Sequence, residues 1–321
     1  MWFLLRKSTE KRESKEENKY LCTIMEQFYR VAGLAFAVSM DDSHPLWAHM
    51  PNYQPFEQEV PSGELLFRLT VTDGMELPKT EPYYKEDPDR PDMPRVMVYR
   101  HSDGTLSFSM KPTAKQPDAY LLDMSADFTH GTLHLHDSGQ FQKFAIDNSL
   151  MLMFTMSTTG LDTLAMHASV VMHGGMGYMF LGLSGTGKST HSRLWLENIP
   201  DCQLLNDDNP VVRIMPDGKA WVYGTPWSGK TPCYKNEQVP VGGIVLIRRC
   251  KHNAVSRLSI PEAFAALLMS CSGLKFSQES TDRLTHTQSK LLGAVPFYVM
   301  DCLPDADAAV VCHQGVCKKC K

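Results

Sequence analysis

In the first half of the chain, apolar and polar residues alternate in short runs separated by turn-forming residues. This period of two is typical of strands that bury one face and expose the other. The stretch 77–94 carries five prolines among many charges, which predicts an exposed loop with no regular element. The expected strands of this half are 64–71, 95–100, 105–110 and 132–136.

In the second half, runs suited to buried strands alternate with runs suited to helices. The apolar run 177–181 predicts a buried strand, and residues 189–197 predict a helix shortly after it. Gly174-Gly175 and the triplet 216–218, Pro-Asp-Gly, are hairpin signals. The patterns of the two halves together predict an α/β (α+β) fold whose N-terminal part is rich in strands.

The patterns also suggest where the parts begin and end. We expect a frayed or disordered leader over 1–25, with Met25 as an alternative start, and a β-rich domain of unknown role over 26–150. A second domain is expected over 151–321, after a soft boundary near 145–155 where Asp147 caps a helix through Met153.

Composition narrows the class of protein. The 321 residues are 43% hydrophobic and 21% charged, which suffices for one large core or two modest ones. A net charge of −4 gives no electrostatic reason to expect nucleic acid or an anionic membrane as a partner. The nine cysteines lack a disulfide framework, so we expect free thiols and a cytoplasmic protein, with the oligomeric state open to a homo-oligomer.

Residues 182–189 read G-L-S-G-T-G-K-S and fill the template of a phosphate-binding P-loop, or Walker A motif. Glycines let successive backbone N–H groups point inward, the lysine can reach the β- and γ-phosphates, and the final hydroxyl can ligate Mg²⁺. A strand before the loop and a helix after it are the context this motif requires. The expected nucleotide-binding residues are Gly182, Ser184, Gly185, Thr186, Gly187, Lys188, Ser189 and Thr190.

Two carboxylates follow the loop at the end of another apolar run. Residues 204–208 read L-L-N-D-D, so Asp207 and Asp208 come where a P-loop protein needs an acidic group for Mg²⁺ and for hydroxyl activation. Upstream, residues 164–171 predict a strand that contains one histidine, His167. A lone strand histidine is usually a packed or surface residue, so it gains meaning only from its neighbours.

The order M-H-A-S-V-V, then the loop G-L-S-G-T-G-K-S-T, then N-D-D resembles the catalytic domain of HPr kinase/phosphorylase and its relatives. The loop string is also similar to that of ATP-dependent phosphoenolpyruvate (PEP) carboxykinase, which shares the same kind of P-loop fold. The resemblance covers about residues 160–250 and implies an HPr-kinase/PEP-carboxykinase-like P-loop domain there, after the β-rich N-terminal domain that the strand patterns predict. The first 150 residues do not resemble the N-terminal domain of HPr kinases, so HPr is not carried over as the substrate.

The resemblance implies roles for individual residues. Lys188 and Ser189 would serve ATP and Mg²⁺, and Asp208 would be a second metal ligand. Either Asp207 or Asp208 would be the general base, with His167 touching that carboxylate, and the choice between them stays open. Lys230, at the end of the loop 224–230, is a further candidate for contacting the transferred phosphate. Weaker candidates for that contact are Arg248 and Arg249.

The expected activity is therefore a Mg-ATP-dependent kinase that phosphorylates a hydroxyl of a protein, peptide or small molecule, with serine as the favoured acceptor. The alternative is a catalytically silent nucleotide-sensing binding protein. A carboxykinase-type enzyme is a third interpretation, weakened because those enzymes are much longer and no arginine-rich oxaloacetate site can be mapped. We expect the N-terminal half to select the acceptor through exposed aromatic residues such as Trp47, Tyr53 and Phe56.

Overall fold

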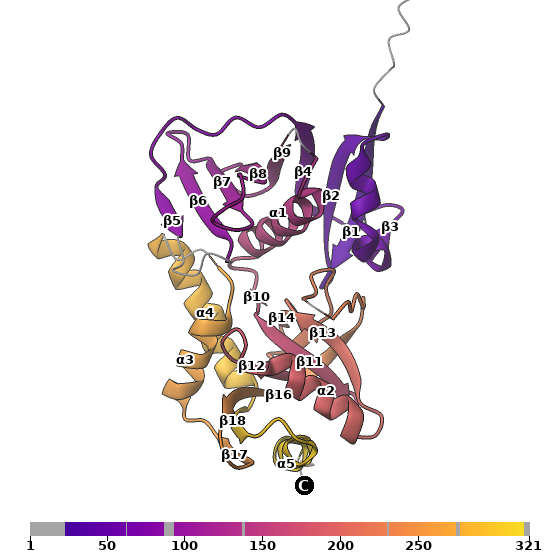
Figure 1. Cartoon of the computed structure of the whole chain (residues 1–321), viewed down its shortest axis with the longest axis vertical. Coiled ribbons are helices and arrows are strands. Elements are labelled where there is room, and N and C mark those ends of the chain that lie inside the picture. The colour runs from indigo at the N-terminus through magenta and orange to yellow at the C-terminus, as the bar shows by residue number, and fades with distance from the viewer. Residues whose placement is uncertain are drawn as a thin grey trace, which may run out of the picture.

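The computed structural model of the chain describes residues 23–61, 63–86, 93–136, 139–229, 231–273 and 277–317. These residues form two mixed β-sheets, one above the other in Figure 1, with helices packed on each, which confirms the predicted mixed α/β class. No helix within these ranges is long and apolar enough to span a bilayer.

The first sheet has the strand order β3-β1-β2-β4-β9-β8-β7-β6-β5. Strands β2, β4 and β9 run parallel, and the neighbours on either side pair antiparallel. Its elements are β1 (Ile24–Val31), β2 (Leu34–Asp41), β3 (Glu57–Gln58), β4 (Leu65–Asp73), β5 (Tyr84–Glu86), β6 (Arg95–Arg100), β7 (Leu106–Lys111), β8 (Tyr120–Met124), β9 (His130–Leu135) and two short 3-10 helices, η1 (Pro45–His49) and η2 (Pro51–Phe56).

Helix α1 (Gln142–Ser157) packs on this first sheet, against β4, β8 and β9. Ala145, Ile146 and Leu150 on α1 are buried in the same core as the sheet. The boundary expected near 145–155 therefore falls inside a helix that belongs by its packing to the strand-rich half.

Three local predictions in this half were wrong. The helix begins at Gln142, so Asp147 lies inside α1 rather than at its cap, where its carboxylate accepts from Lys143 at 2.8 Å. The proline-rich stretch contains β5, which pairs with β6 at the sheet edge. Strand β1 begins at Ile24, so Met25 belongs to the sheet, whereas residues 1–22 of the expected leader lie outside the described residues.

The aromatic residues expected to be exposed are mostly core residues. Tyr53 and Phe56 on η2 are fully buried, and Trp47 on η1 is half-buried. The Tyr53 hydroxyl accepts a hydrogen bond at 3.0 Å from the indole Nε1 of Trp227, a residue of the second half. Pro51 begins η2 and Pro55 lies inside it, and an apolar and polar pattern does not encode how this short helix packs. The buried Tyr53 and Phe56 therefore form no free surface, and the hydrogen bond between Tyr53 and Trp227 joins the two halves.

The second sheet has the strand order β10-β14-β15-β16-β12-β11-β13. Outside this order, β18 pairs with both β16 and β17. Its strands are β10 (Thr163–Ala165), β11 (Ala168–His173), β12 (Met176–Leu181), β13 (Gln203–Asp208), β14 (Val211–Ile214), β15 (Ala220–Tyr223), β16 (Gln238–Arg249), β17 (Ala254–Arg257) and β18 (Phe297–Cys302). Its helices are α2 (Lys188–Asn198), α3 (Ile260–Ser270), α4 (Gln278–Ala294) and α5 (Ala306–Val316).

Both faces of this sheet are covered, as the alternation along β12 illustrates. Met179 and Leu181 join the core that includes α3 and α4, and Tyr178 and Phe180 join the core that includes α2 and α5. A strand whose two faces are both buried reads as a continuous apolar run, which is the pattern that predicted it. The strand expected over 164–171 is interrupted: Met166 and His167 separate β10 from β11.

The two turn signals predicted in this half are confirmed. Gly174 and Gly175, both with positive φ, form the turn between β11 and β12, and the triplet 216–218 lies between β14 and β15. The Asp305 carboxylate caps α5 by accepting from the N–H of Ala308 at 3.0 Å.

Candidate functional site

The P-loop lies between β12 and α2, as its sequence requires. Gly182 has a φ of 151°, and a Cβ there would come within 2.5 Å of the Thr186 hydroxyl, so only glycine fits. Gly187, with a φ of 115°, stands immediately before the first residue of α2. The loop thus leads directly into the N-terminus of α2, and a helix N-terminus attracts anions.

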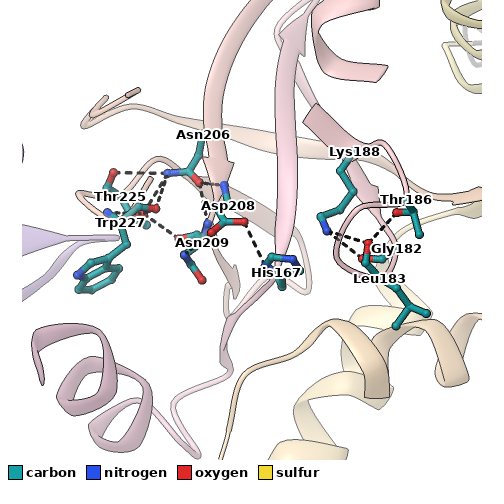
Figure 2. Close-up of polar contacts among 10 residues, drawn as sticks. All are labelled: His167, Gly182, Leu183, Thr186, Lys188, Asn206, Asp208, Asn209, Thr225 and Trp227. Carbon is teal, nitrogen blue, oxygen red and sulfur yellow. Dashed lines mark hydrogen bonds and ion pairs between the residues drawn. The ribbon is translucent and has the colours of Figure 1, made fainter. Parts of the chain in front are cut away.

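Lys188 is the first residue of α2 and is only 7% exposed. Its ammonium group donates to the carbonyl oxygens of Gly182 at 2.9 Å and Leu183 at 3.5 Å (Figure 2). Burial lowers the pKa of Lys188, while Asp208 and Asp207 counteract this lowering. The lysine is therefore a positive charge held against the loop with two carboxylates nearby.

His167 and Asp208 come together through the pairing of two strands. Strand β11 pairs antiparallel with β13, and Ala168 lies opposite Asp208 in this register. His167 precedes β11, and its backbone N–H donates to Ser270 O at 2.7 Å. Its ring Nδ1 lies 3.2 Å from the Asp208 carboxylate (Figure 2). The structure thus brings together two residues that lie far apart in the sequence.

Asn206 holds the end of β13, although no role was predicted for it from the sequence. Its side chain is 0% exposed, its oxygen accepts from the backbone N–H groups of Asp208 at 2.9 Å and Asn209 at 3.0 Å, and its nitrogen donates to the Thr225 hydroxyl at 3.0 Å (Figure 2). Asn209 in turn donates to the Asp208 carboxylate at 3.2 Å. The amide in the N-D-D string was the only sequence signal for this support.

The loop after β15 lies against the end of β13, next to the two aspartates. A bridge pairs Ser228 with Asp208, and Gly229 donates its N–H to Asp207 O at 2.6 Å. A Cβ on Gly229 would lie 3.0 Å from the Asp208 Cβ and 3.1 Å from its Cγ, so this position is tight for any side chain. Lys230 lies outside the described residues, and its expected role stays a prediction.

Burial shifts the pKa values of the two paired groups toward each other. Burial raises the pKa of the Asp208 carboxyl, and the neighbouring His167 and Lys188 oppose that rise. Burial also lowers the pKa of His167, against the attraction of Asp208. A carboxylate with a raised pKa next to an imidazole with a lowered one can exchange a proton with a bound hydroxyl near neutral pH more readily than an isolated aspartate.

Most of the expected site residues line one cavity of about 610 Å³. It is lined by His167, Ser184, Gly185, Gly187, Lys188, Ser189, Thr190, Asp207, Asp208, Gly229 and Arg249. Gly182 and Thr186 are absent from this wall and instead support the loop, because the Thr186 hydroxyl donates to Leu183 O at 2.8 Å. Arg249 reaches the loop carbonyls of Thr186 and Gly185, whereas Arg248 forms a two-point ion pair with Asp301.

The oxygen atoms around this cavity suit a hard cation. Mg²⁺ takes oxygen ligands and is usually held by one or two carboxylates together with phosphate oxygens and water. Ser189, Asp207 and Asp208 supply one hydroxyl and two carboxylates to the same wall, so their chemistry fits. Among the described residues, no group of three or more His, Cys, Asp or Glu side chains could hold a metal by itself.

Comparison with family models and with curated proteins finds no match. Among solved structures, the chain is similar to the HPr(Ser) kinase/phosphatase from Coxiella burnetii, with a TM-score of 0.30 and 11% sequence identity. That alignment covers 47% of this chain and 86% of the other. A likeness of this size carries no argument about activity, so a function has to be argued from the geometry of the site.

Proposed function

We propose that the protein is a Mg-ATP-dependent phosphotransferase that phosphorylates a hydroxyl group, with serine as the acceptor residue. The observation that carries the proposal is the His167–Asp208 pair facing Lys188 and the P-loop across one cavity. A protein that only senses nucleotide needs the loop and the lysine. It has no use for a carboxylate whose pKa is raised beside an imidazole.

The loop would bind the nucleotide. Backbone N–H groups of residues 184–188 would surround the β- and γ-phosphates, and the Lys188 ammonium would exchange its carbonyl partners for phosphate oxygens. Ser189 and Asp207 would hold Mg²⁺, which supplies neutralisation of the phosphate charge. Asp207 is favoured for this role because it is 4% exposed and because His167 pairs with its neighbour Asp208 instead.

Asp208 would act as the general base. Its carboxylate would take the proton of the acceptor hydroxyl as that oxygen attacks the γ-phosphorus, and ADP would leave along the opposite direction. His167 would orient the carboxylate through their 3.2 Å contact. This assignment chooses between the two aspartates that the sequence left open, and it moves the metal role expected for Asp208 to Asp207.

The decisive experiment separates the base from the binding residues. Transfer of labelled γ-phosphate from ATP to a library of serine-containing peptides and to free L-serine is measured for the wild type, Asp208→Asn and Asp207→Asn. We expect Asp208→Asn to lower transfer about 10²- to 10⁴-fold while ATP affinity, measured by calorimetry, changes little. Asp207→Asn should instead raise the Mg²⁺ concentration needed for half-maximal transfer.

Asp217→Asn is the matched control, since Asp217 lies on an exposed turn and pairs with Lys219 at 3.2 Å. It should behave as the wild type. Transfer by Asp208→Asn at the wild-type rate would remove the base assignment. A wild-type protein that binds ATP and phosphorylates neither peptides nor serine would instead be a nucleotide sensor.

A further inference from the structure

Three cavities of the structure follow one another along the junction between the two sheets. The cavity at the P-loop, called the phosphate cavity, shares Gly229 with a second cavity of about 410 Å³, called the polar cavity. The polar cavity shares Asn148 and Met151 with a third cavity of about 650 Å³, called the apolar cavity. Shared walls make these spaces neighbours in a row that begins beside Asp208.

The polar cavity is built by both halves of the molecule. The second half contributes Asn209 and the loop 226–229, and the first contributes Asn52 on η2 together with α1. Lys143 Nζ lies 2.8 Å from the Asp147 carboxylate and 3.1 Å from Asn52 Oδ1. Asn52 Nδ2 donates at 3.0 Å both to Asp147 and to the carbonyl of Pro226.

These bonds determine what the polar cavity can recognise. Lys143 and Asp147 neutralise each other, so neither presents an unpaired charge to a bound molecule. Amide, carbonyl and hydroxyl groups nevertheless lie along the wall, which suits a neutral guest that both donates and accepts hydrogen bonds. A polypeptide backbone has this chemistry at every residue.

The apolar cavity lies at the far end of the row. It is lined by residues of β6, β7 and α1, among them Val98, Phe108 and Met151. Its mouth carries Tyr84 of β5, a 42% exposed ring. Most of this lining is apolar, although Glu86, Asn148, Thr155 and Ser272 also belong to it, so the space favours an apolar side chain.

We propose that the acceptor is a serine in a polypeptide segment that crosses this junction, with its hydroxyl at Asp208, its backbone in the polar cavity and an apolar side chain in the apolar cavity. This inference rests on the proposed phosphotransferase function and names its substrate class. A free amino acid could reach Asp208 but has no group for the apolar cavity. A peptide gains binding energy from that remote contact, which raises the efficiency of transfer at the reacting hydroxyl.

The test compares acceptors and variants in the full-length protein. The probes are a serine-peptide library randomised on both sides of the serine, and free L-serine, each with labelled ATP and Mg²⁺. The wild type should select an apolar residue at one fixed distance from the serine, and should phosphorylate selected peptides at least about tenfold more efficiently than free serine.

Two substitutions of one residue test the row of cavities directly. Met151→Lys places a charge where the polar and apolar cavities meet, and should lower kcat/KM for the selected peptide about tenfold or more. Met151→Ala enlarges the apolar cavity and should shift the selection toward larger apolar side chains. Val60→Lys is the control: Val60 is 73% exposed, lies outside the three cavities, and should leave selection unchanged. Circular dichroism and thermal unfolding check that each variant is folded.

The outcomes separate this inference from the function it rests on. Equal efficiency on free serine and peptides, or transfer without any preference for an apolar residue, would overturn the peptide acceptor and leave the phosphotransferase standing. A selection that Met151→Ala leaves unchanged, in a folded protein, would also overturn it. Nucleotide binding without transfer to either probe would overturn the phosphotransferase itself, and the peptide acceptor with it.

Discussion

The two halves of the molecule differ in where they bury polar groups, which in the first half include Asn52, Ser109 and Asp118. In the strand-rich first half, the buried core is aromatic and aliphatic, with rings such as Phe36 and Phe67 stacked at 4.8 Å. In the second half, a lysine, an aspartate and an asparagine are buried at one edge of the sheet, where β12 and β13 end. Lys188, Asp207 and Asn206 all lie there.

This difference indicates which substitutions should affect folding stability and which should affect the chemistry of the site. Burying a charge costs free energy unless partners offset it, so a cluster of such groups persists where each one is held by hydrogen bonds. Asn206 and the loop carbonyls provide those bonds around the P-loop. Substitutions at this edge should therefore affect binding or transfer, whereas substitutions in the first half should affect folding or the choice of acceptor.

The largest effect on nucleotide binding in the second half is expected from Lys188→Ala. The ammonium is the mobile positive charge of the P-loop, and a hydrogen bond to a charged group contributes about 1.5–3 kcal/mol, so ATP affinity should fall about 10- to 100-fold. Calorimetry with Mg-ATP measures this. Lys219→Ala, on an exposed turn, is the control and should bind normally, and equal affinity in both variants would contradict the P-loop assignment.

The next effect concerns pH and His191 of α2, which is buried beside the loop. Its Nε2 accepts from Trp195 at 3.2 Å, and burial lowers its pKa from 6.5 to about 4. The unfolded chain therefore binds the proton first as pH falls, so this contribution to stability is present above about pH 6.5 and is lost toward pH 4. At pH 5 the loss should be about 2 kcal/mol.

Urea unfolding at pH 7 and pH 5 tests this contribution. His191→Gln keeps an acceptor for the indole and removes the titration, so its stability should fall about 2 kcal/mol less than that of the wild type between the two pH values. An identical pH dependence in the two proteins would mean that His191 does not stay neutral in the fold.

A smaller effect is expected for His167→Gln. Losing the contact with Asp208 should lower transfer about tenfold, less than the loss of the base itself. His167 opposes the burial that raises the pKa of Asp208, so without it that pKa should rise further and the acid limb of kcat/KM should move to higher pH. A pH profile over the acid range measures the shift, and a lower rate with an unmoved limb would indicate a structural role only.

The smallest effect on the site itself should come from the first half, in Tyr53→Phe. The change removes the acceptor of the buried Trp227 indole N–H and leaves the ring packing in place, which should cost about 1–2 kcal/mol of folding stability. ATP affinity should not change, because neither ring lines the phosphate cavity. Thermal unfolding and calorimetry together decide this, and a loss of nucleotide affinity in the folded variant would break the separation between the halves.

Much of the candidate site could be predicted from the sequence because its parts are local. The P-loop, its flanking strand β12 and helix α2, and the N-D-D string at the end of β13 are contiguous segments whose conformation follows from nearby residues. The roles of Asn206 and Arg249 were harder to predict, because they depend on contacts with atoms of other segments.

Errors arose where distant segments decide a residue's environment. Tyr53 and Phe56 were predicted to be exposed, and Trp227 was predicted only as part of the loop 224–230, yet Tyr53 and Trp227 pack in one core. Asp147 has a residue type that suits a helix cap, but α1 begins five residues earlier, at Gln142, with Phe141 as its N-cap at a φ of 72°.

The sequence alone determined features that act over a few residues, namely the glycine positions with positive φ in the P-loop and the turn at Gly174-Gly175. The tertiary structure decided which distant groups meet. Strand register set His167 against Asp208, and the packing of α1 and η2 on the first sheet placed Met151 and Asn52 in cavities beside the site. The physical reason is that turns and caps depend on local backbone conformation, whereas pairing between strands and packing between sheets depend on apolar surface and hydrogen bonds contributed by residues far apart in the chain.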